Sequence, residues 1–497
     1  MNMKLPNSVH RVVAVVMTTV VMTTVAMCCL TACSDNDDSD VPASATEMKL
    51  VVNGEHYDIA LPATDAVDLV TLCREFDAEF QVENADAFKT ITIGGQPLTD
   101  GHCALAIKDI SKDAKIEIAY TTGDQQGTIT LNTLHSGIPE INASGRALIP
   151  GQFYLSFIYL RLIMKYDNSG DVVYYRFEPT YLSGTFSELG YWDFKKHVFD
   201  GKTYYSYHAP DPKYADLACT GYDPGMRVLM DDHYVSLDTI HALASRDGFL
   251  PDGAPLDGHD FYFFSPTHYI ASASYVEREI DGEPRSVAYL QEVEDGKVVF
   301  DWWSTEHPEM ADWCSPVFDT SYDYVHFNSL QVLPDSNWLC SFRMLNSLLK
   351  IDRKNGTGDI IWRIAGDQQD EPLSFYGQHY ATLHDDGTLT LFDNGNGHTP
   401  QHTRLLRLQI NPETGEVLGG GDMLSPHGDY FTHACGAIQL FGDRFTVGWG
   451  WGVEMGKNDR LVTEHNANGV EIFSLRFPRL RYRRNSVHST YRCVKYN

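Results

Sequence analysis

The sequence predicts an all-β protein, in which a six-bladed β-propeller follows a small N-terminal β-sandwich domain. Short runs that alternate apolar and polar residues recur along most of the chain, and turn residues such as Asp-Gly and Asn-Gly separate them. Strand–turn–strand units of this kind recur at least five times after residue 138, which is typical of a propeller. Helical patterns are scarce, and only residues 238–245 suit a short helix. A large β-sandwich is the alternative all-β fold.

The composition is that of an acidic globular protein. The chain has 497 residues, of which 43% are hydrophobic and 21% are charged, so it can bury a large core. Its 67 acidic residues outnumber its 38 basic residues, and the formal net charge is −29. Because the phosphates of nucleic acids need a basic protein surface, we expect no nucleic-acid partner.

The first 32 residues are expected to be a secretory signal peptide. Lys4 and Arg11 precede an apolar stretch, residues 12–30, and small residues then lead to Cys33. The tetrapeptide that ends at Cys33 resembles the bacterial lipobox, in which this cysteine carries the lipid anchor. An ordinary signal peptide or a single transmembrane anchor is the alternative.

Residues 33–45 are expected to be a flexible acidic tether, because four aspartates in residues 34–40 leave nothing to bury. The segment also resembles the acidic export signal of bacterial surface lipoproteins. We therefore expect an outer-membrane lipoprotein that is displayed on the cell surface or faces the periplasm. No other segment has the roughly 18 consecutive apolar residues that a membrane-spanning helix needs.

The remaining chain divides into two predicted β-domains. Residues 46–138 contain alternating runs such as 88–93 and 115–120, which indicate a small β-sandwich. Residues 139–497 contain the repeated hairpins, for example 382–391, and form the predicted propeller. Six blades over this span have about 60 residues each, more than the ~40–50 of common blades, so we expect long loops between strands.

Three histidines each stand at the start of an apolar strand, and we expect them to carry the chemistry. They are His259, His326 and His379. The innermost strands of a propeller line a central channel, so equivalent strand starts on successive blades lie together at one end. For any one of these histidines alone, a hydrogen-bonded structural role is the alternative.

An arginine and an asparagine accompany these histidines. Arg343 ends the strand that follows His326, and an antiparallel return places it near the same end of the sheet. A guanidinium can hold two oxygens of an oxyanion at once. With Asn328 nearby, the set suits a tetrahedral anion. Three histidines could instead bind zinc, but the motif HExxH is absent and an arginine would repel a cation, so we expect no metal and no cofactor.

These residues resemble the bacterial arylsulfate sulfotransferases, which do not use the nucleotide sulfate donor PAPS. The resemblance is strongest from His326 to Gly397, and it covers most of residues 46–497. It rests on His259-Asp260, on the runs 132–139, 326–329, 352–363, 377–379 and 392–396, and on Arg343. It implies a six-bladed propeller with a small N-terminal β-domain. It also implies an enzyme that moves a sulfuryl group from a phenolic sulfate ester to another phenol.

The resemblance further implies a role for each site residue. His379 is the expected nucleophile, which becomes sulfated on a ring nitrogen and gives ping-pong kinetics. The expected contacts to the sulfuryl oxygens come from His259, His326, Asn328 and Arg343. Thr432 is a candidate for one further hydroxyl contact. Either His326 or His259 could protonate the leaving phenolate and then deprotonate the acceptor.

Two other functions remain open at the level of the sequence. An aryl sulfate hydrolase would use the same intermediate and pass the sulfuryl group to water. A non-catalytic cell-surface propeller would bind glycans or proteins and would not need the histidines to lie together.

Overall fold

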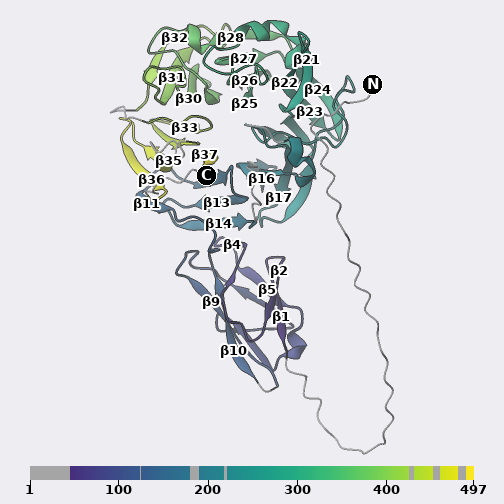
Figure 1. Cartoon of the computed structure of the whole chain (residues 1–497). Helices are drawn as coiled ribbons and strands as arrows, with labels where there is room; N and C mark the ends of the chain where they lie inside the picture. Colours follow the sequence, from purple (N-terminus) through teal and green to yellow (C-terminus); the bar gives the residue numbers. More distant parts are fainter. Residues whose placement is uncertain are drawn as a thin grey trace, which may run out of the picture. The chain divides into compact units, whose positions relative to one another are not determined.

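The computed structural model describes residues 45–123, 125–179, 190–217, 221–424, 430–451, 459–478 and 489–497. The predicted signal peptide (1–32), the lipidation site Cys33 and all but the last residue of the predicted tether (33–45) lie outside these ranges. The described residues are almost entirely β-strands and loops (Figure 1), which confirms the predicted all-β class.

Two sheets form the N-terminal domain, and the alternation seen in the sequence has a direct structural cause. Along β9, the residues Ile116, Ile118 and Tyr120 are buried and the residues between them are exposed or half-buried, because one face of the sheet packs on the core. The first sheet has the order β2(Glu55–Ala60), β1(Glu47–Val52), β5(Ala78–Val82), β8(His102–Leu105). The second has the order β3(Val67–Asp68), β10(Gln126–Asn132), β9(Lys115–Thr121), β6(Thr90–Ile93), β7(Gln96–Pro97).

Six antiparallel sheets follow, and they are the blades of the predicted propeller (Figure 1). Blades 2 to 5 are each made of strands from one stretch of chain. Blade 2 is β15(Trp192–Phe199), β16(Lys202–Pro210), β17(Gly225–Met230), β18(Ser236–Ile240). Blade 3 is β19(Phe261–Ser265), β20(His268–Ser272), β23(Tyr289–Glu294), β24(Lys297–Trp303), with an inserted hairpin β21(Val276–Ile280), β22(Glu283–Val287). Blade 4 is β25(Phe327–Val332), β26(Trp338–Phe342), β27(Ser347–Ile351), β28(Ile360–Ala365). Blade 5 is β29(His379–Leu383), β30(Thr388–Asp393), β31(Arg404–Ile410), β32(Val417–Asp422).

Blades 1 and 6 join distant parts of the chain and close the ring. Blade 1 has the order β37(Thr490–Tyr496), β12(Gln152–Phe157), β13(Leu162–Tyr166), β14(Val172–Phe177), β4(Thr71–Cys73). Its innermost strand therefore comes from the C-terminal end, and its outermost strand comes from the N-terminal domain. Blade 6 has the order β33(Ala437–Phe441), β34(Arg444–Gly448), β35(Arg460–His465), β36(Glu471–Arg476), β11(Asn142–Gly145). The six innermost strands, β37, β15, β19, β25, β29 and β33, contact one another in this order around the axis.

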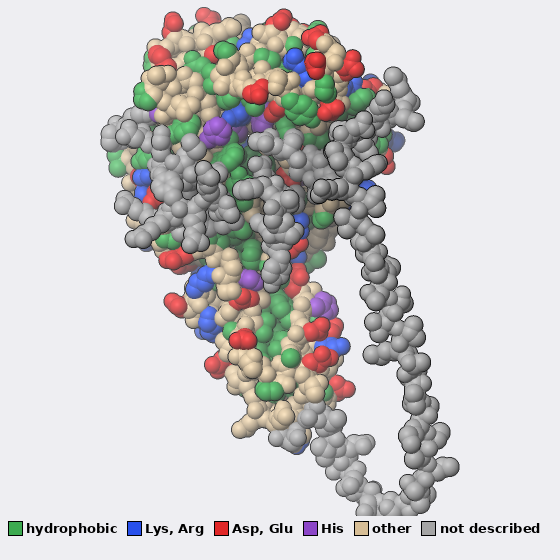
Figure 2. All heavy atoms as spheres, in the orientation of Figure 1, with side chains coloured by type: hydrophobic (Ala, Val, Ile, Leu, Met, Phe, Trp, Pro, Cys, Tyr) green, Lys and Arg blue, Asp and Glu red, His purple; other side chains and the backbone are tan. Residues whose placement is uncertain are grey.

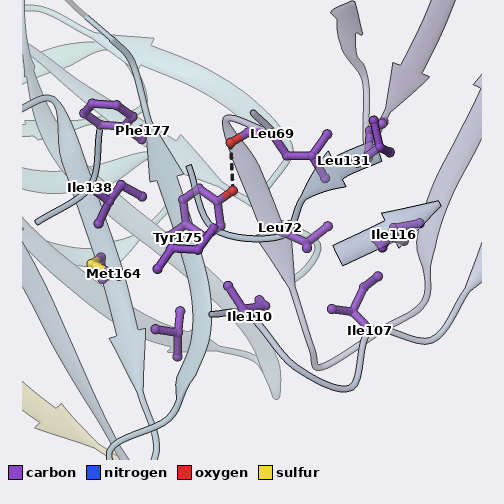
Figure 3. Close-up of a cluster of buried hydrophobic side chains, with 14 of the residues drawn as sticks. Leu69, Leu72, Ile107, Ile110, Ile116, Leu131, Ile138, Met164, Tyr175 and Phe177 are labelled. Carbon is purple, nitrogen blue, oxygen red and sulfur yellow. Dashed lines mark hydrogen bonds between the residues drawn. The ribbon is translucent and has the colours of Figure 1, made fainter. Parts of the chain in front are cut away.

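The N-terminal domain and blade 1 share one hydrophobic core (Figure 3). Leu69, Leu72 and Leu131 from the N-terminal domain pack in the same cluster as Met164 and Tyr175 of blade 1. The Tyr175 hydroxyl donates a hydrogen bond to the Leu69 carbonyl at 2.8 Å, so the one polar group at this point of the cluster has a partner.

One local prediction was wrong. Residues 238–245 do not form a helix, because 236–240 form the outermost strand of blade 2 and pair antiparallel with β17. Backbone pairing with the existing sheet overrides the weak local preference. Among the residues that the structure describes, the helical segments are five short 3-10 turns, η1(Ala85–Ala87), η2(Pro212–Leu217), η3(Ser304–Glu306), η4(Pro308–Trp313) and η5(Gly366–Gln368). Within the described part of the chain, no helix has the length and apolar character needed to cross a membrane.

Candidate active site

The predicted site residues stand where the innermost strands begin. His259 precedes β19, His326 immediately precedes β25, and His379 is the first residue of β29. The rings of His259 and His326 meet edge to face with centroids 4.9 Å apart. The face in Figure 2 shows histidine side chains within the propeller, beside hydrophobic side chains. The common direction of the innermost strands thus brings side chains from separate blades to one end of the channel.

A carboxylate holds the ring of His259. Its Nδ1 lies 2.7 Å from Oδ1 of Asp257, and both side chains are buried. The rings of Trp192, Tyr222 and Tyr491 surround the imidazole with centroids 5.4–5.5 Å away. Because Asp257 accepts the proton on Nδ1, the other ring nitrogen, Nε2, is free for a ligand.

A second carboxylate holds the ring of His326. Its Nδ1 lies 2.5 Å from Oδ2 of Asp323, whose other oxygen accepts a hydrogen bond from the Tyr222 hydroxyl at 2.8 Å. Burial lowers the pKa of His326 despite the opposing effect of Asp323, and the charges of His259 and Arg343 lower it further. The backbone of His326 is left-handed, with φ of 48°, and a bulge follows in β25. Both features turn this side chain out of the regular alternation of the strand.

His379 has a different partner, a neutral amide. Its Nδ1 lies 2.7 Å from Oδ1 of Asn394 and 3.1 Å from the Gly377 carbonyl, and the backbone N–H of Cys435 lies 3.2 Å from its Nε2. A carbonyl can only accept and a backbone N–H can only donate. The proton therefore sits on Nδ1, and Nε2 carries the lone pair. Burial, and next the charge on Arg343, hold the pKa of His379 well below its usual value of 6.5.

Arg343 is a buried cation beside these rings. Its guanidinium lies 4.5 Å from the ring centroid of Phe318, and Nη2 lies 3.4 Å from the His433 carbonyl. Nη1 reaches only the Met344 sulfur, at 3.5 Å, and Nε has no partner among the described residues. Burial lowers the pKa of Arg343 from 12.5, and the group is still charged at neutral pH. None of its described contacts is a carboxylate, so its charge is available to an anion.

Asn328 and Thr432 are both fully buried next to this set. The Asn328 amide nitrogen donates to the Gln378 carbonyl at 2.7 Å and has a second hydrogen to offer. The hydroxyl of Thr432 has no partner among the described residues, and its backbone carbonyl accepts from Asn394 at 2.9 Å. The structure thus places all six predicted residues at one end of the channel.

The sequence reasoning missed the groups that orient the rings. Asp257 stands two residues before His259, and Asp323 stands three residues before His326, so an aspartate just upstream of each histidine was a readable signal. Asn394 lies in the run 392–396, on which the family resemblance partly rests, but no contact with His379 was predicted for it. By contrast Asp260, the direct neighbour of His259, turns away from the site and pairs with Lys195 and Arg492. In the described part of the chain, no group of three or more His, Cys, Asp or Glu side chains is arranged to hold a metal ion.

Comparison with known proteins gives a family match for part of the chain. The sequence profile of the arylsulfotransferase (ASST) family matches residues 285–477. Comparison with curated proteins gives no match. Among solved structures, the chain is similar to a protein of unknown function from Bacteroides caccae, with 10% identity, a TM-score of 0.40, and coverage of 70% of this chain and 98% of that one.

The chain is also similar to two further solved structures. A quinonprotein alcohol dehydrogenase-like protein from Bacteroides thetaiotaomicron is 9% identical, with a TM-score of 0.33 over 87% of this chain and 99% of that one. Virginiamycin B lyase from Staphylococcus aureus is 12% identical, with a TM-score of 0.33 over 68% of this chain and 89% of that one. The span matched by the family profile contains every predicted site residue except His259. Residues 285–477, less than half of the chain, thus resemble the arylsulfotransferase family.

Proposed function

We propose that this protein transfers a sulfuryl group from a phenolic sulfate ester to another phenol, through a sulfated His379 and without PAPS. The observation that carries the proposal is the buried guanidinium of Arg343, which contacts no carboxylate among the described residues and lies next to an imidazole whose Nε2 bears the lone pair. The first group binds the sulfuryl oxygens, and the second attacks the sulfur.

The proposed reaction has two balanced steps. In the first, Nε2 of His379 forms a bond to sulfur while the bond from sulfur to the phenolic oxygen breaks, and the leaving phenolate takes a proton from His259 or His326. In the second step, the histidine that gave up this proton, His259 or His326, removes the proton of the acceptor phenol. The acceptor oxygen bonds to sulfur, and the bond between sulfur and Nε2 of His379 breaks. Sulfuryl transfer has a loose transition state in which charge gathers on the outer oxygens, as in phosphoryl transfer.

The backbone N–H of Cys435 takes part in the first step. It donates a hydrogen bond to Nε2 of His379 at 3.2 Å. Once Nε2 is bonded to sulfur its lone pair is used, and this N–H would donate to a sulfuryl oxygen instead. Together with the Arg343 guanidinium, the Asn328 amide and the Thr432 hydroxyl, it forms a set of fixed donors around the transferred group.

The partners of the rings support the assignment of roles. A carboxylate partner makes an imidazole more basic and stabilises its protonated form, which suits a group that moves protons. Asp257 contacts Nδ1 of His259, and Asp323 contacts Nδ1 of His326, where it opposes the lowering of the His326 pKa by burial. Asn394 orients His379 without adding a negative charge, so sulfated His379 remains a good leaving group.

The test is an assay with a chromogenic aryl sulfate, with and without an added phenol, in the presence of a chelator. We expect phenol to accelerate release of the chromophore and to become sulfated, and the chelator to have no effect. We expect His379→Ala to abolish transfer in a folded protein. His384→Ala, at the residue that directly follows the same strand, is the matched control and retains transfer. Release of the chromophore at a rate that does not depend on added phenol indicates a hydrolase. No release of the chromophore in any condition indicates a non-catalytic propeller.

A further inference from the structure

Five charged side chains from the inner strands, their flanking residues and β17 form a cluster around Asp260, the residue that follows His259. We call it the channel ion cluster, and it consists of Asp193, Lys195, Arg227, Asp260 and Arg492. Asp193 pairs with all three cations at 3.0–3.1 Å. Asp260 pairs with Lys195 at 2.5 Å and with Arg492 at 3.2 Å.

The cluster carries an excess positive charge. Three cations face two carboxylates, and Lys195 is the most exposed member with only 14% of its side chain exposed. Burial by itself would raise the pKa of Asp260, but Arg492 and Lys195 lower it overall, so this carboxylate is ionised. One net positive charge is therefore held in a region of low dielectric, where an uncompensated ion costs free energy.

A cavity of about 380 Å³ adjoins the cluster at the end of the channel opposite the histidines. Its walls include Lys195, Asp260 and Arg492 of the cluster, together with Gln331 and Thr382 from the later residues of β25 and β29. This volume is in the range of small-molecule sites.

Donor groups are available in this cavity. Nε of Arg492 is buried without a hydrogen-bond partner among the described residues. Ser329 and Lys196 also line the wall, although the Lys196 ammonium already contacts the Asn497 carbonyl. Tyr380 contributes an aromatic surface and lies 4.9 Å from the Arg492 guanidinium.

We propose that this cavity is a second anion site, which binds a small carboxylate, sulfate or phosphate group and thereby balances the excess charge of the channel ion cluster. The site is separate from the proposed sulfuryl-transfer site and does not depend on it. It also explains why a strand-lined channel keeps a third cation, Lys195, where two arginines already match the two aspartates.

The test measures anion binding in a background that removes the cation of the other site. Arg343→Gln protein is titrated separately with inorganic phosphate, sulfate and acetate at constant ionic strength, by calorimetry and by thermal unfolding. We expect saturable binding and a matching rise in Tm, and the three titrations show which anion the site prefers.

Lys195→Met in the same background leaves two arginines with two aspartates, so the cluster becomes neutral. We expect it to weaken anion binding by about tenfold or more. Lys202→Met, on the same hairpin but exposed, is the matched control and keeps the affinity of the background. If Lys195→Met does not fold, Lys195→Gln replaces it. Absence of saturable binding in the Arg343→Gln background, or equal binding after the Lys195 substitution, overturns the proposal.

Discussion

Arg343 is 6% exposed, and its described contacts are carbonyl, thioether and aromatic groups. A buried cation without a counter-ion costs free energy, and a bound anion offsets this cost. The planar guanidinium also matches two oxygens of a tetrahedral group, which an ammonium cannot do. The chemistry of this one side chain therefore favours a sulfuryl ligand over a neutral one.

We expect Arg343→Lys to be nearly as damaging as Arg343→Ala, because lysine keeps the charge and loses the paired contacts. Loss of one such donor typically lowers kcat about 10²–10³-fold. Turnover of an aryl sulfate with saturating phenol measures the effect. Arg363→Lys, an arginine on the same blade that stacks on Trp313, is the matched control with near-wild-type turnover. Near-wild-type turnover of Arg343→Lys would refute the paired contact.

We expect Asn394→Asp to change the pH dependence of the first half-reaction. Only neutral His379 can attack, and its pKa lies well below 6.5. The first turnover releases phenol in a burst, and we expect this burst in the wild type to stay constant as the pH falls through about 6.5. A carboxylate on Nδ1 stabilises the protonated ring and raises this pKa. The burst in the variant therefore declines at higher pH than in the wild type.

Rapid-mixing measurements of phenol release across mildly acidic pH give the comparison. A structural role for Asn394 alone predicts a smaller amplitude with an unchanged pH profile, and this outcome would contradict a direct effect of residue 394 on the basicity of His379. Asn394→Ala, which removes the partner without adding charge, separates loss of orientation from the change in basicity.

At the scale of elements, the strand starts around the site are irregular. His326, Tyr380 and Cys435 all have left-handed backbones, with φ of 48°, 50° and 64°. Bulges interrupt the pairing of β25 with β26 and of β29 with β30. Strained residues of this kind persist only where the surrounding structure holds them, and they gather at functional sites. In this propeller, the bulges turn side chains out of the strand alternation and toward the channel end.

Strand β37 links the closure of the ring to the site. It pairs with β12 as the innermost strand of blade 1, and the Tyr491 hydroxyl donates to the Asn328 carbonyl at 3.1 Å. We expect a chain that ends at residue 489 to lose cooperative thermal unfolding, because blade 1 would expose its inner face and the ring would remain open. Circular dichroism during heating measures this. A truncated chain with the wild-type transition would show that β37 is dispensable for closure.

At the scale of the whole molecule, the acidic surface bears on how the protein could be attached to a membrane. Acidic side chains spread over the face shown in Figure 2 and agree with the net charge of −29. Such a surface is soluble and does not favour anionic membranes or nucleic acids. An attachment to the envelope would therefore depend on the lipid at Cys33 rather than on the folded domains.

We expect Cys33→Ser to move the protein from the membrane fraction to the soluble fraction without changing its specific activity. The predicted lipid on Cys33 would supply the membrane affinity, and the candidate site residues lie far from it in the sequence, from residue 259 onward. Fractionation of cells, followed by the aryl sulfate assay on both fractions, measures the outcome. Retention of Cys33→Ser protein on membranes would point to an uncleaved transmembrane anchor.

The sequence by itself determined the class of fold, because period-two alternation and Asp-Gly turns are local properties that any sheet must satisfy. It also singled out the candidate residues His259, His326 and His379 at strand starts and Arg343 at a strand end, since such positions remain visible in a linear pattern. Only the tertiary structure decided the strand at 236–240, the closure of blade 1 by β37 and β4, and the distinct partners of the three rings. The closure of blade 1 depends on contacts between residues about a hundred or more positions apart, as between Tyr491 and Asn328, and a local pattern carries no information on such contacts. The strand at 236–240 and the ring partners involve nearer residues, but backbone pairing and burial in the folded sheets decide which of the possible local contacts form.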